Sequence, residues 1–249
     1  MERIRTRTLN HLQKQELTQL AKRCQAHEPL ALSAPLEDGL EYVLAMDGGQ
    51  LAGFAFLFFP EETICECSAF VDPGRRRQGI FRQLLDDVLD LVDDREKQTG
   101  SQIDFCFLID ERTPSAMAVM KALEAEYWYS EYTMVRPLSQ EDTDYRCGLQ
   151  ICRQEDGLYA AVLDGAAAGT CAILPGESGY YLYAFQIRED LRGQGYGRDF
   201  LLGMLALLAA DRSAPRQVSL QVSGLNGAAR SLYKKTGFRD AEALSYYLY

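Results

Sequence analysis

One short sequence pattern occurs twice in this chain of 249 residues, and it constrains the fold more than any other feature. Val71–Gly79 aligns without a gap on Ile187–Gly195, and each copy lies between a predicted strand and a predicted helix. The copies are about 115 residues apart, a spacing typical of a duplicated domain rather than of a solenoid repeat. We therefore predict a first domain over 1–137, a linker over 138–145 and a second domain over 146–249.

Hydrophobic periodicity predicts nearly the same order of elements in both halves. In the first half we expect strands at 41–46, 51–59, 63–71, 103–109 and 127–135, and helices at 12–24, 80–92 and 114–125. In the second half we expect strands at 159–163, 169–174, 180–187, 218–222 and 243–249, and helices at 195–210 and 228–236. The first helix has no counterpart in the second half. The pattern predicts a mixed α/β fold (α+β, with mixed sheets) whose second domain lacks the N-terminal helices.

Composition excludes several classes of function. The formal net charge of −10 argues against nucleic-acid binding, which requires a basic surface. The longest apolar stretch, Leu201–Ala210, is too short to cross a membrane. The N-terminus lacks the apolar core of a signal peptide, and seven cysteines, an odd number, fit a reducing compartment better than a disulfide framework. We expect a cytoplasmic protein.

Cysteine and histidine give little support for a metal site. Cys65 and Cys67 are spaced to share one face of a strand, but the chain has only two histidines and no second cysteine pair at zinc-finger spacing. We expect buried thiols and no metal.

The segment Arg192–Gly197 has the composition of an anion-binding loop. It contains three glycines, follows a predicted strand and leads into an apolar helix. Glycine lets the backbone approach a ligand closely, and the free N–H groups of a first helical turn attract an anion. Such a loop is suited to a pyrophosphate, although a structural turn is about as common.

Rival phosphate loops fail on the residues that follow. A P-loop requires Lys and then Ser or Thr, whereas this chain has Arg198 and Asp199. The dinucleotide fingerprint requires a glycine where Arg198 stands. The remaining Arg-x-x-Gly-x-Gly pattern resembles the motif with which the GNAT N-acetyltransferase superfamily holds the coenzyme A pyrophosphate.

A second block strengthens this resemblance. Asn226–Phe238 is similar to the family element Asn-x-x-Ala-x-x-Leu-Tyr-x-x-x-Gly-Phe and follows a predicted strand. Asn226 either caps the helix or bonds the pantetheine arm. Tyr233 is either a core aromatic residue or, as the resemblance implies, the general acid that protonates the departing thiolate.

The resemblance implies acetyl-CoA as co-substrate, held where the strand 180–187 splays from the strand 218–222. Backbone groups of Phe185 and Ile187 would pair with pantetheine, and one N–H would polarise the thioester carbonyl. For the general base the family uses a carboxylate or a relayed water, but the strand 180–187 contains no acidic residue. The candidates are Glu177, just before this strand, or a base from the first half such as Glu66 on the equivalent strand. The implied coenzyme site comprises Phe185, Gln186, Ile187, Arg192, Gly193, Gln194, Gly195, Tyr196, Gly197, Arg198, Asn226 and Tyr233.

The first half departs from the family pattern. Phe81 stands where Gly or Ala is typical, and Ala122 is expected at the position of the tyrosine. Without a phenol this half is expected to be a scaffold that helps to wall the acceptor pocket, although its loop arginines leave residual coenzyme binding open.

These observations predict an N-acetyltransferase that moves an acetyl group to a primary amine by direct attack in a ternary complex. The acceptor is a small-molecule or peptide amine that the sequence does not identify, and the sequence does not indicate an oligomeric state. The alternative is a non-catalytic acyl-CoA-binding or regulatory module, which the absence of a carboxylate from the strand 180–187 favours.

Overall fold

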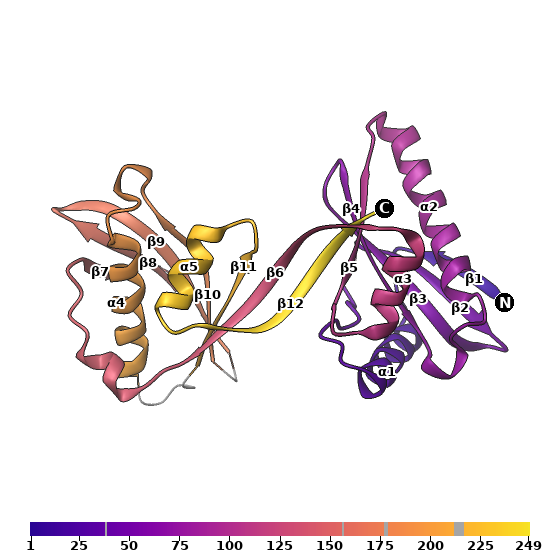
Figure 1. Ribbon diagram of the computed structural model, residues 1–249, viewed down its shortest axis with the longest axis horizontal. Coiled ribbons are helices and arrows are strands. Elements are labelled where there is room, and N and C mark those ends of the chain that lie inside the picture. Colours follow the sequence, from indigo (N-terminus) through magenta and orange to yellow (C-terminus); the bar gives the residue numbers. More distant parts are fainter. Residues whose placement is uncertain (38, 156, 177–178, 212–216) are drawn as a thin grey trace. The chain divides into compact units, whose positions relative to one another are not determined.

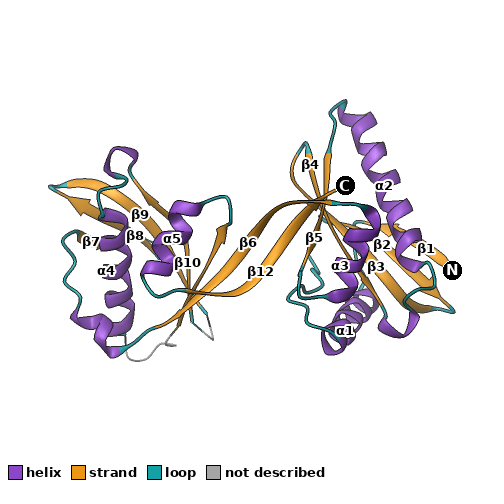
Figure 2. Ribbon diagram, in the orientation of Figure 1, coloured by secondary structure: helices purple, strands orange, loops and turns teal. Residues whose placement is uncertain are grey.

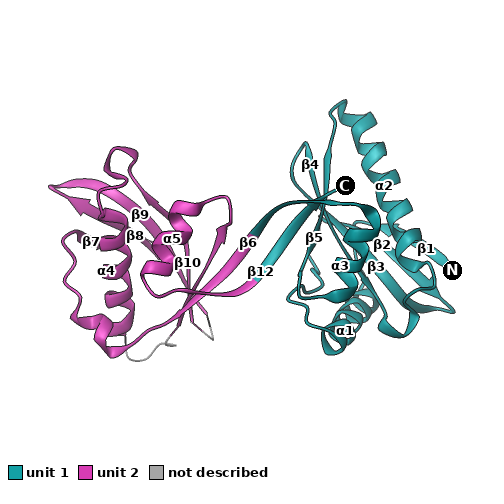
Figure 3. Cartoon of the chain, viewed as in Figure 1, with its two compact units in different colours: residues 1–130, 243–249 teal, residues 131–242 magenta. Residues whose placement is uncertain are grey.

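The computed structural model describes the whole chain except residues 38, 156, 177–178 and 212–216. The chain forms two compact units (Figure 3). Unit 1 comprises Met1–Ser130 and Ala243–Tyr249, and unit 2 comprises Glu131–Glu242. Each unit combines a mixed sheet with helices (Figure 2), so the predicted mixed α/β fold is confirmed.

Unit 1 has the strand order β1-β2-β3-β4-β5-β12. Every neighbouring pair is antiparallel except β4 and β5, which are parallel. Its helices and strands, labelled in Figure 1, are β1 (Glu2–Thr6), α1 (His11–His27), β2 (Glu41–Asp47), β3 (Gln50–Glu61), β4 (Ile64–Val71), α2 (Ile80–Thr99), β5 (Asp104–Ile109) and α3 (Pro114–Leu123). The 3₁₀ turn η1 (Pro73–Arg75) lies between β4 and α2.

The helices of unit 1 begin and end at residues suited to these positions. Asn10 caps α1 and forms a reciprocal capping box with Gln13. Gly79 and Gly100, both left-handed, bound α2. The helix therefore continues seven residues beyond the predicted end at residue 92, because the charged segment after it keeps helical geometry until a glycine ends it.

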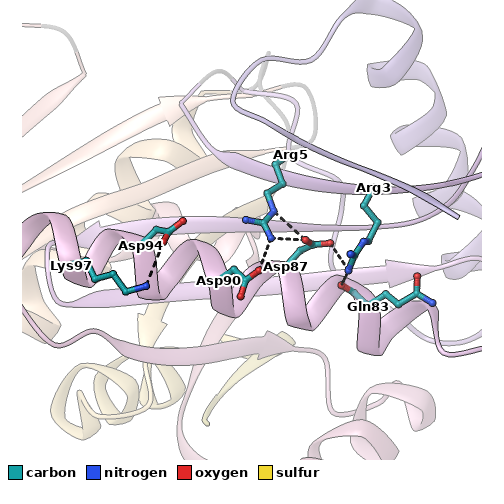
Figure 4. Close-up of polar contacts among 7 residues, drawn as sticks. All are labelled: Arg3, Arg5, Gln83, Asp87, Asp90, Asp94 and Lys97. Atoms are coloured by element: carbon teal, nitrogen blue, oxygen red, sulfur yellow. Dashed lines mark hydrogen bonds and ion pairs between the residues drawn. The ribbon is translucent and has the colours of Figure 1, made fainter.

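Strand β1 was not predicted from the sequence, and ion pairs hold it to α2 (Figure 4). Arg5 donates to Asp87 and to Asp90, and Arg3 lies 3.1 Å from the other oxygen of Asp87. The Asp87 side chain is almost buried, so these arginines neutralise a carboxylate that would otherwise be costly to bury. The strand is too short and too polar to show a clear alternation of its own.

Unit 2 has the strand order β6-β11-β10-β9-β8-β7. Its elements are β6 (Glu126–Pro137), η2 (Gln140–Asp144), β7 (Gln150–Arg153), β8 (Leu158–Leu163), β9 (Ala166–Pro175), β10 (Tyr180–Ile187), η3 (Glu189–Leu191), α4 (Tyr196–Ala210), β11 (Gln217–Ser223), α5 (Gly227–Lys235) and β12 (Arg239–Leu248). Among its described residues no α-helix precedes β8, in agreement with the predicted loss of the N-terminal helices.

Strands β6 and β12 each contribute to both units. Residues 131–137 of β6 pair with β11 in unit 2, whereas residues 245–248 of β12 pair with β5 in unit 1. The compact units therefore differ from the predicted domain ranges, which assigned 131–137 to the first domain and 243–249 to the second. Alternation of side chains shows that a segment is a strand but does not show which strand it pairs with.

The segment predicted as a linker is packed against unit 2. Asp142 pairs with Arg136, and the Tyr145 hydroxyl donates to Asp199 on α4 at 2.6 Å. Asp199 also accepts from the backbone N–H groups of Gly148 and Leu149. Residues 138–145 thus include the turn η2 and are anchored through the first turn of α4.

The two units differ in how their sheets are covered. In unit 1, α2 and α3 pack on one face around Val43 and Ala55, and α1 packs on the other face around Tyr42 and Phe54. In unit 2, α4 and α5 belong to one core cluster on one face of the sheet. Among the described residues of unit 2, no helix takes the place that α1 has in unit 1.

Candidate functional site

Strands β10 and β11 of unit 2 separate soon after they meet. They pair in parallel only at Tyr180–Val218 and Tyr181–Ser219, although both strands continue. A bulge follows in β10, where Ala184 has a φ of 48°. A parallel pair that ends this early leaves backbone N–H and C=O groups of β10 without strand partners, available to an extended ligand.

The loop after β10 holds several N–H groups without partners. Gly193 and Gly195 have φ values of 75° and 93°, which favour glycine. The Arg192 Nε donates to the carbonyl of Ile187 at 3.0 Å and ties the loop to the strand end. Among the described residues, no acceptor engages the N–H groups of Gly193–Gly197. With the N-terminus of α4 behind them, these N–H groups have the arrangement that attracts an anion.

The residues predicted to begin and end helix α5, Asn226 and Gly237, do so in the structure. The side chain of Asn226 accepts from the N–H of Ala229 at 3.1 Å, so this residue caps the helix. After the helix ends, Gly237 has a φ of 93° and the N–H of Phe238 returns to the carbonyl of Tyr233. The caps fix both ends of this short helix, one face of which packs against Phe185 of β10.

Tyr233 lies on that face, and its side chain is only 6% exposed. Its ring packs edge-on against Phe185 of β10, with centroids 6.4 Å apart, and against Phe238 at 5.7 Å. Burial raises the pKa of Tyr233 to about 12, so the phenol keeps its proton at neutral pH. Among the described residues its hydroxyl has no hydrogen-bond partner. A buried, protonated phenol beside a splayed strand is suited to donating a proton.

The other predicted coenzyme residues lie around this gap. Phe185 stacks on Phe200 of α4, Ile187 is buried in the core, and Gln186 is exposed. Tyr196 packs on the core of unit 2, whereas Arg198 lies in the first turn of α4 and Arg192 in the loop before it.

Of the two predicted general bases, the structure describes one. Glu177 lies outside the described residues. Glu66 lies on β4 of unit 1, opposite Cys106 of β5.

Unit 1 repeats the geometry of this site. Arg77 and Gly79 have φ values of 63° and 80°, close to those of the two loop glycines of unit 2, and Arg76 Nε donates to the carbonyl of Val71 at 3.3 Å. Strands β4 and β5 also separate, after the pair Cys67–Phe107. A cavity of about 630 Å³ opens between these strands, the loop, α3 and residues of α1.

Glu28 is one of the carboxylates that line this cavity. Glu28 pairs with Arg76 and accepts from the hydroxyl of Ser115 at 2.6 Å. Burial works to raise its pKa, but the hydrogen bonds from Ser115 and Arg76 hold the pKa of Glu28 below its usual value. The loop arginine is therefore already neutralised within unit 1.

The structure corrects the alignment of α3 with α5. In unit 1 the N–H of Ala125 returns to the carbonyl of Met120, as the N–H of Phe238 returns to Tyr233 in unit 2. Glu124, with a φ of 55°, then corresponds to Gly237. Met120, and not Ala122, therefore stands at the position of the tyrosine, because α3 begins two residues earlier than the sequence alignment assumed. A thioether cannot donate a proton, so the expected lack of a phenol in unit 1 holds.

The described residues can be searched for a membrane-spanning helix and for a cluster of metal-ligating side chains. Within the described ranges, no helix is long and apolar enough to span a membrane. The same residues contain no group of three or more His, Cys, Asp or Glu side chains arranged to hold a metal ion. Cys65 and Cys67 are both buried in the core of unit 1, where burial raises the pKa of each thiol.

Comparisons with known proteins agree with this geometry. The model of the acetyltransferase (GNAT) family matches residues 7–104 and 118–238. A curated relative, the uncharacterized N-acetyltransferase YycN of Bacillus subtilis (strain 168), is 35% identical over 68 residues. That match covers 26% of this chain and 40% of the relative's length.

Solved structures are similar over nearly the whole chain. A GCN5-related N-acetyltransferase from Sphaerobacter thermophilus has a TM-score of 0.77 at 18% identity, covering 99% of this chain and 95% of that one. A tandem GNAT protein from the clavulanic acid biosynthesis pathway has a TM-score of 0.73 at 17% identity, covering 100% and 98%. At these identities the similarity concerns the fold alone, including its tandem arrangement.

Proposed function

This chain belongs to the GNAT family of acetyltransferases, and we propose that its unit 2 transfers the acetyl group of acetyl-CoA to a primary amine. One observation carries the proposal: unit 2 combines a splayed strand pair, a cradle of free N–H groups and the protonated phenol of Tyr233. Unit 1 has the first two features but not the third. An acidic protein with net charge −10 also favours a cationic acceptor over an anionic one.

The residues of unit 2 fit acetyl-CoA, which supplies the acetyl group as a thioester. We assign its pyrophosphate to the N–H groups of Gly193–Gly197, with Arg198 near enough in sequence to add a positive charge. The unpaired edge of β10 at Phe185 and Ile187 is suited to the amides of the pantetheine arm. An N–H of this edge would polarise the thioester carbonyl.

In the proposed reaction the amine attacks the thioester directly, within a ternary complex. Tyr233 donates its proton to the sulfur as the bond to the acetyl carbon breaks. Its high pKa keeps that proton in place at neutral pH, and the packing of its ring on Phe185 orients the phenol toward β10. No covalent intermediate with the protein and no metal ion takes part in this scheme.

We assign unit 1 a supporting rather than a catalytic role. Met120 replaces the phenol, Phe81 adds an aromatic side chain to the first turn of α2, and Glu28 neutralises the loop arginine. The cavity of unit 1 is nevertheless open to a ligand, so the assignment of the coenzyme to unit 2 requires a direct test.

The two loops offer a matched pair of variants for that test. Gly195 and Gly79 occupy equivalent positions, both have a positive φ, and a Cβ added at either would meet no atom within 4 Å. Gly195→Glu and Gly79→Glu therefore impose the same strain and the same charge, one in each unit. We expect calorimetric titration with acetyl-CoA to show binding by the wild type and by Gly79→Glu, and none by Gly195→Glu. Loss of binding in Gly79→Glu alone would move the site to unit 1.

A second candidate function is a non-catalytic module that binds acyl-CoA. The absence of any acidic residue from β10 favours it, because the reaction needs a proton acceptor. Release of free thiol from acetyl-CoA across a panel of small amines, with mass detection of acetylated products, separates the two functions. A protein that binds acetyl-CoA but acetylates no amine supports the module.

A further inference from the structure

We propose that Glu131 of β6 is the general base of this reaction, and that the sheet face around it binds the acceptor as a protonated primary amine. The inference rests on the proposed function and adds the residue that the sequence did not supply. It is carried by strand register and by the position of Glu131 relative to Tyr233.

Strand register places Glu131 beside the gap in the sheet of unit 2. Glu131 is paired with Ser223, the last residue of β11. On the other side of β11, Tyr181 of β10 pairs with Ser219. Four residues further along these parallel strands, β11 reaches Ser223 and β10 reaches Phe185, apart from the bulge in β10. Glu131 is therefore level with the part of β10 that is assigned to the thioester, one strand beyond the gap.

The alternation of side chains places Glu131 and Tyr233 on opposite faces of this sheet. Val218, Leu220 and Val222 of β11 belong to the core that contains α5 and Tyr233. Ser223 therefore points to the other face, and its cross-strand partner Glu131 shares that face. A thioester in the gap would have a proton donor on one side and a carboxylate on the other. Direct attack suits this arrangement, because the amine and the group that protonates the sulfur then approach the thioester from different sides.

The surroundings of Glu131 suit a base rather than a structural ion pair. Its side chain is half-buried, and burial raises the pKa of Glu131 above its usual value. Among the described residues it has no ion-pair or hydrogen-bond partner. A cation is thus the missing partner of this carboxylate.

The rest of the face suits an organic cation. Tyr181 and Tyr183 of β10 stack with centroids 6.0 Å apart, and burial together with the nearby charge of Glu131 raises the pKa of Tyr181. Tyr183 is 43% exposed, and Leu174 of β9 is 58% exposed. Aromatic faces attract an ammonium group, and an apolar side chain packs on its carbon frame. The carboxylate, the aromatic rings and the apolar side chain of this face together fit a primary amine with an apolar substituent.

The proposed step is balanced in atoms and electrons. The ammonium group loses one proton to the Glu131 carboxylate, and the free amine forms a C–N bond to the acetyl carbon. The C–S bond breaks, and its electron pair takes the proton of Tyr233. The neutral carboxyl of Glu131 then returns its proton through solvent, which restores the phenol of Tyr233, and the excess proton of the new amide nitrogen leaves to solvent.

Two acceptors separate a base from a structural residue. Benzylamine is protonated at neutral pH and needs a base, whereas hydroxylamine is already unprotonated. We expect Glu131→Gln to lower kcat/KM for benzylamine by about 100-fold or more, within the range of general-base catalysis, and to change that for hydroxylamine by less than about threefold. Glu126→Gln, an exposed carboxylate on the same strand, is the matched control and should behave as the wild type.

Other outcomes overturn the assignment. Glu131→Gln with undiminished benzylamine turnover removes the base role, and an equal loss with both acceptors shows a structural role instead. A wild type that acetylates hydroxylamine but not benzylamine refutes the amine-binding face. Calorimetric titration of the same samples with acetyl-CoA tests the proposed function separately. If the wild type does not bind acetyl-CoA, the proposed function fails. If Glu131→Gln binds acetyl-CoA but its turnover is altered, the result concerns the role of Glu131 alone.

Discussion

Replacing Tyr233 with phenylalanine removes one hydroxyl and leaves the packing of the ring almost unchanged. The ring contacts with Phe185 and Phe238 involve its faces and edges, which phenylalanine keeps. The hydroxyl has no hydrogen-bond partner among the described residues, so its removal should alter the free energy of unfolding at neutral pH by less than about 1 kcal/mol. Turnover should fall by about 100-fold or more, because general-acid catalysis contributes on this scale.

The same variant has a second signature at alkaline pH. Burial raises the pKa of Tyr233 from its usual value of 10 to about 12, so the folded protein holds this proton where the unfolded chain releases it. The contribution of the protonated Tyr233 to the stability of the folded state is complete below pH 10 and is lost as the pH rises to about 12. A pKa difference of about two corresponds to about 2–3 kcal/mol. Between about pH 10 and about pH 12, the free energy of unfolding of Tyr233→Phe should therefore fall by about 2–3 kcal/mol less than that of the wild type.

Urea unfolding from about pH 7 to about pH 12 measures both stabilities, and thiol release from acetyl-CoA measures turnover. Tyr249→Phe is a suitable control, because that tyrosine is exposed and belongs to unit 1, outside the proposed site. The reasoning is refuted if Tyr233→Phe keeps full turnover while the wild type shows the alkaline loss, since the phenol would then be buried but not catalytic. Identical alkaline curves for both proteins would contradict the burial argument itself.

Two further predictions concern stability alone. Arg77 has a φ of 63°, so Arg77→Gly should relieve backbone strain and raise the free energy of unfolding by about 0.5–1 kcal/mol. Arg75→Gly is the control, because it breaks the ion pair with Asp47 and should not raise the free energy of unfolding. A less stable Arg77→Gly protein would show that the arginine side chain matters more than the strain. Asp199→Ala removes the hydrogen-bond acceptor of the Tyr145 hydroxyl and of two backbone N–H groups, and it should lower the free energy of unfolding in urea by about 2–4 kcal/mol. A loss below about 1 kcal/mol would mean that other contacts hold the segment before β7.

Local chemistry made part of the site predictable. The bounds of β10 and the position of α5 followed from short-range patterns, and both belong to the observed structure. Gly193 and Gly195 adopt left-handed backbone conformations that only glycine takes up readily, and Asn226 caps a helix as its side chain suggests. Such features depend on residues a few positions apart, so the order of residues is sufficient to reveal them.

Pairing between distant segments was not predictable in this way. The exchange of β6 and β12 between the units depends on partners that lie far apart in the sequence, and so does the attachment of β1, where Arg5 and Asp87 are 82 positions apart. Periodicity identifies a strand without naming its neighbour, and a polar strand of five residues shows no periodicity at all.

The proposed general base shows most clearly how local patterns differ from pairing between distant segments, because β10 itself contains no acidic residue. In the sequence Glu131 is one polar residue in an aromatic strand, far before Tyr233, and no pattern distinguishes it. The pairing of β6 with β11 brings it level with the gap, one strand away, and the alternation of side chains places it on the sheet face opposite the phenol. The order of residues was enough to indicate the family, the duplicated fold and the left-handed glycines of the loop before α4, because each depends on local residue types. The carboxylate beside the gap became recognisable in the folded chain alone, because strand register joins residues that the sequence keeps far apart.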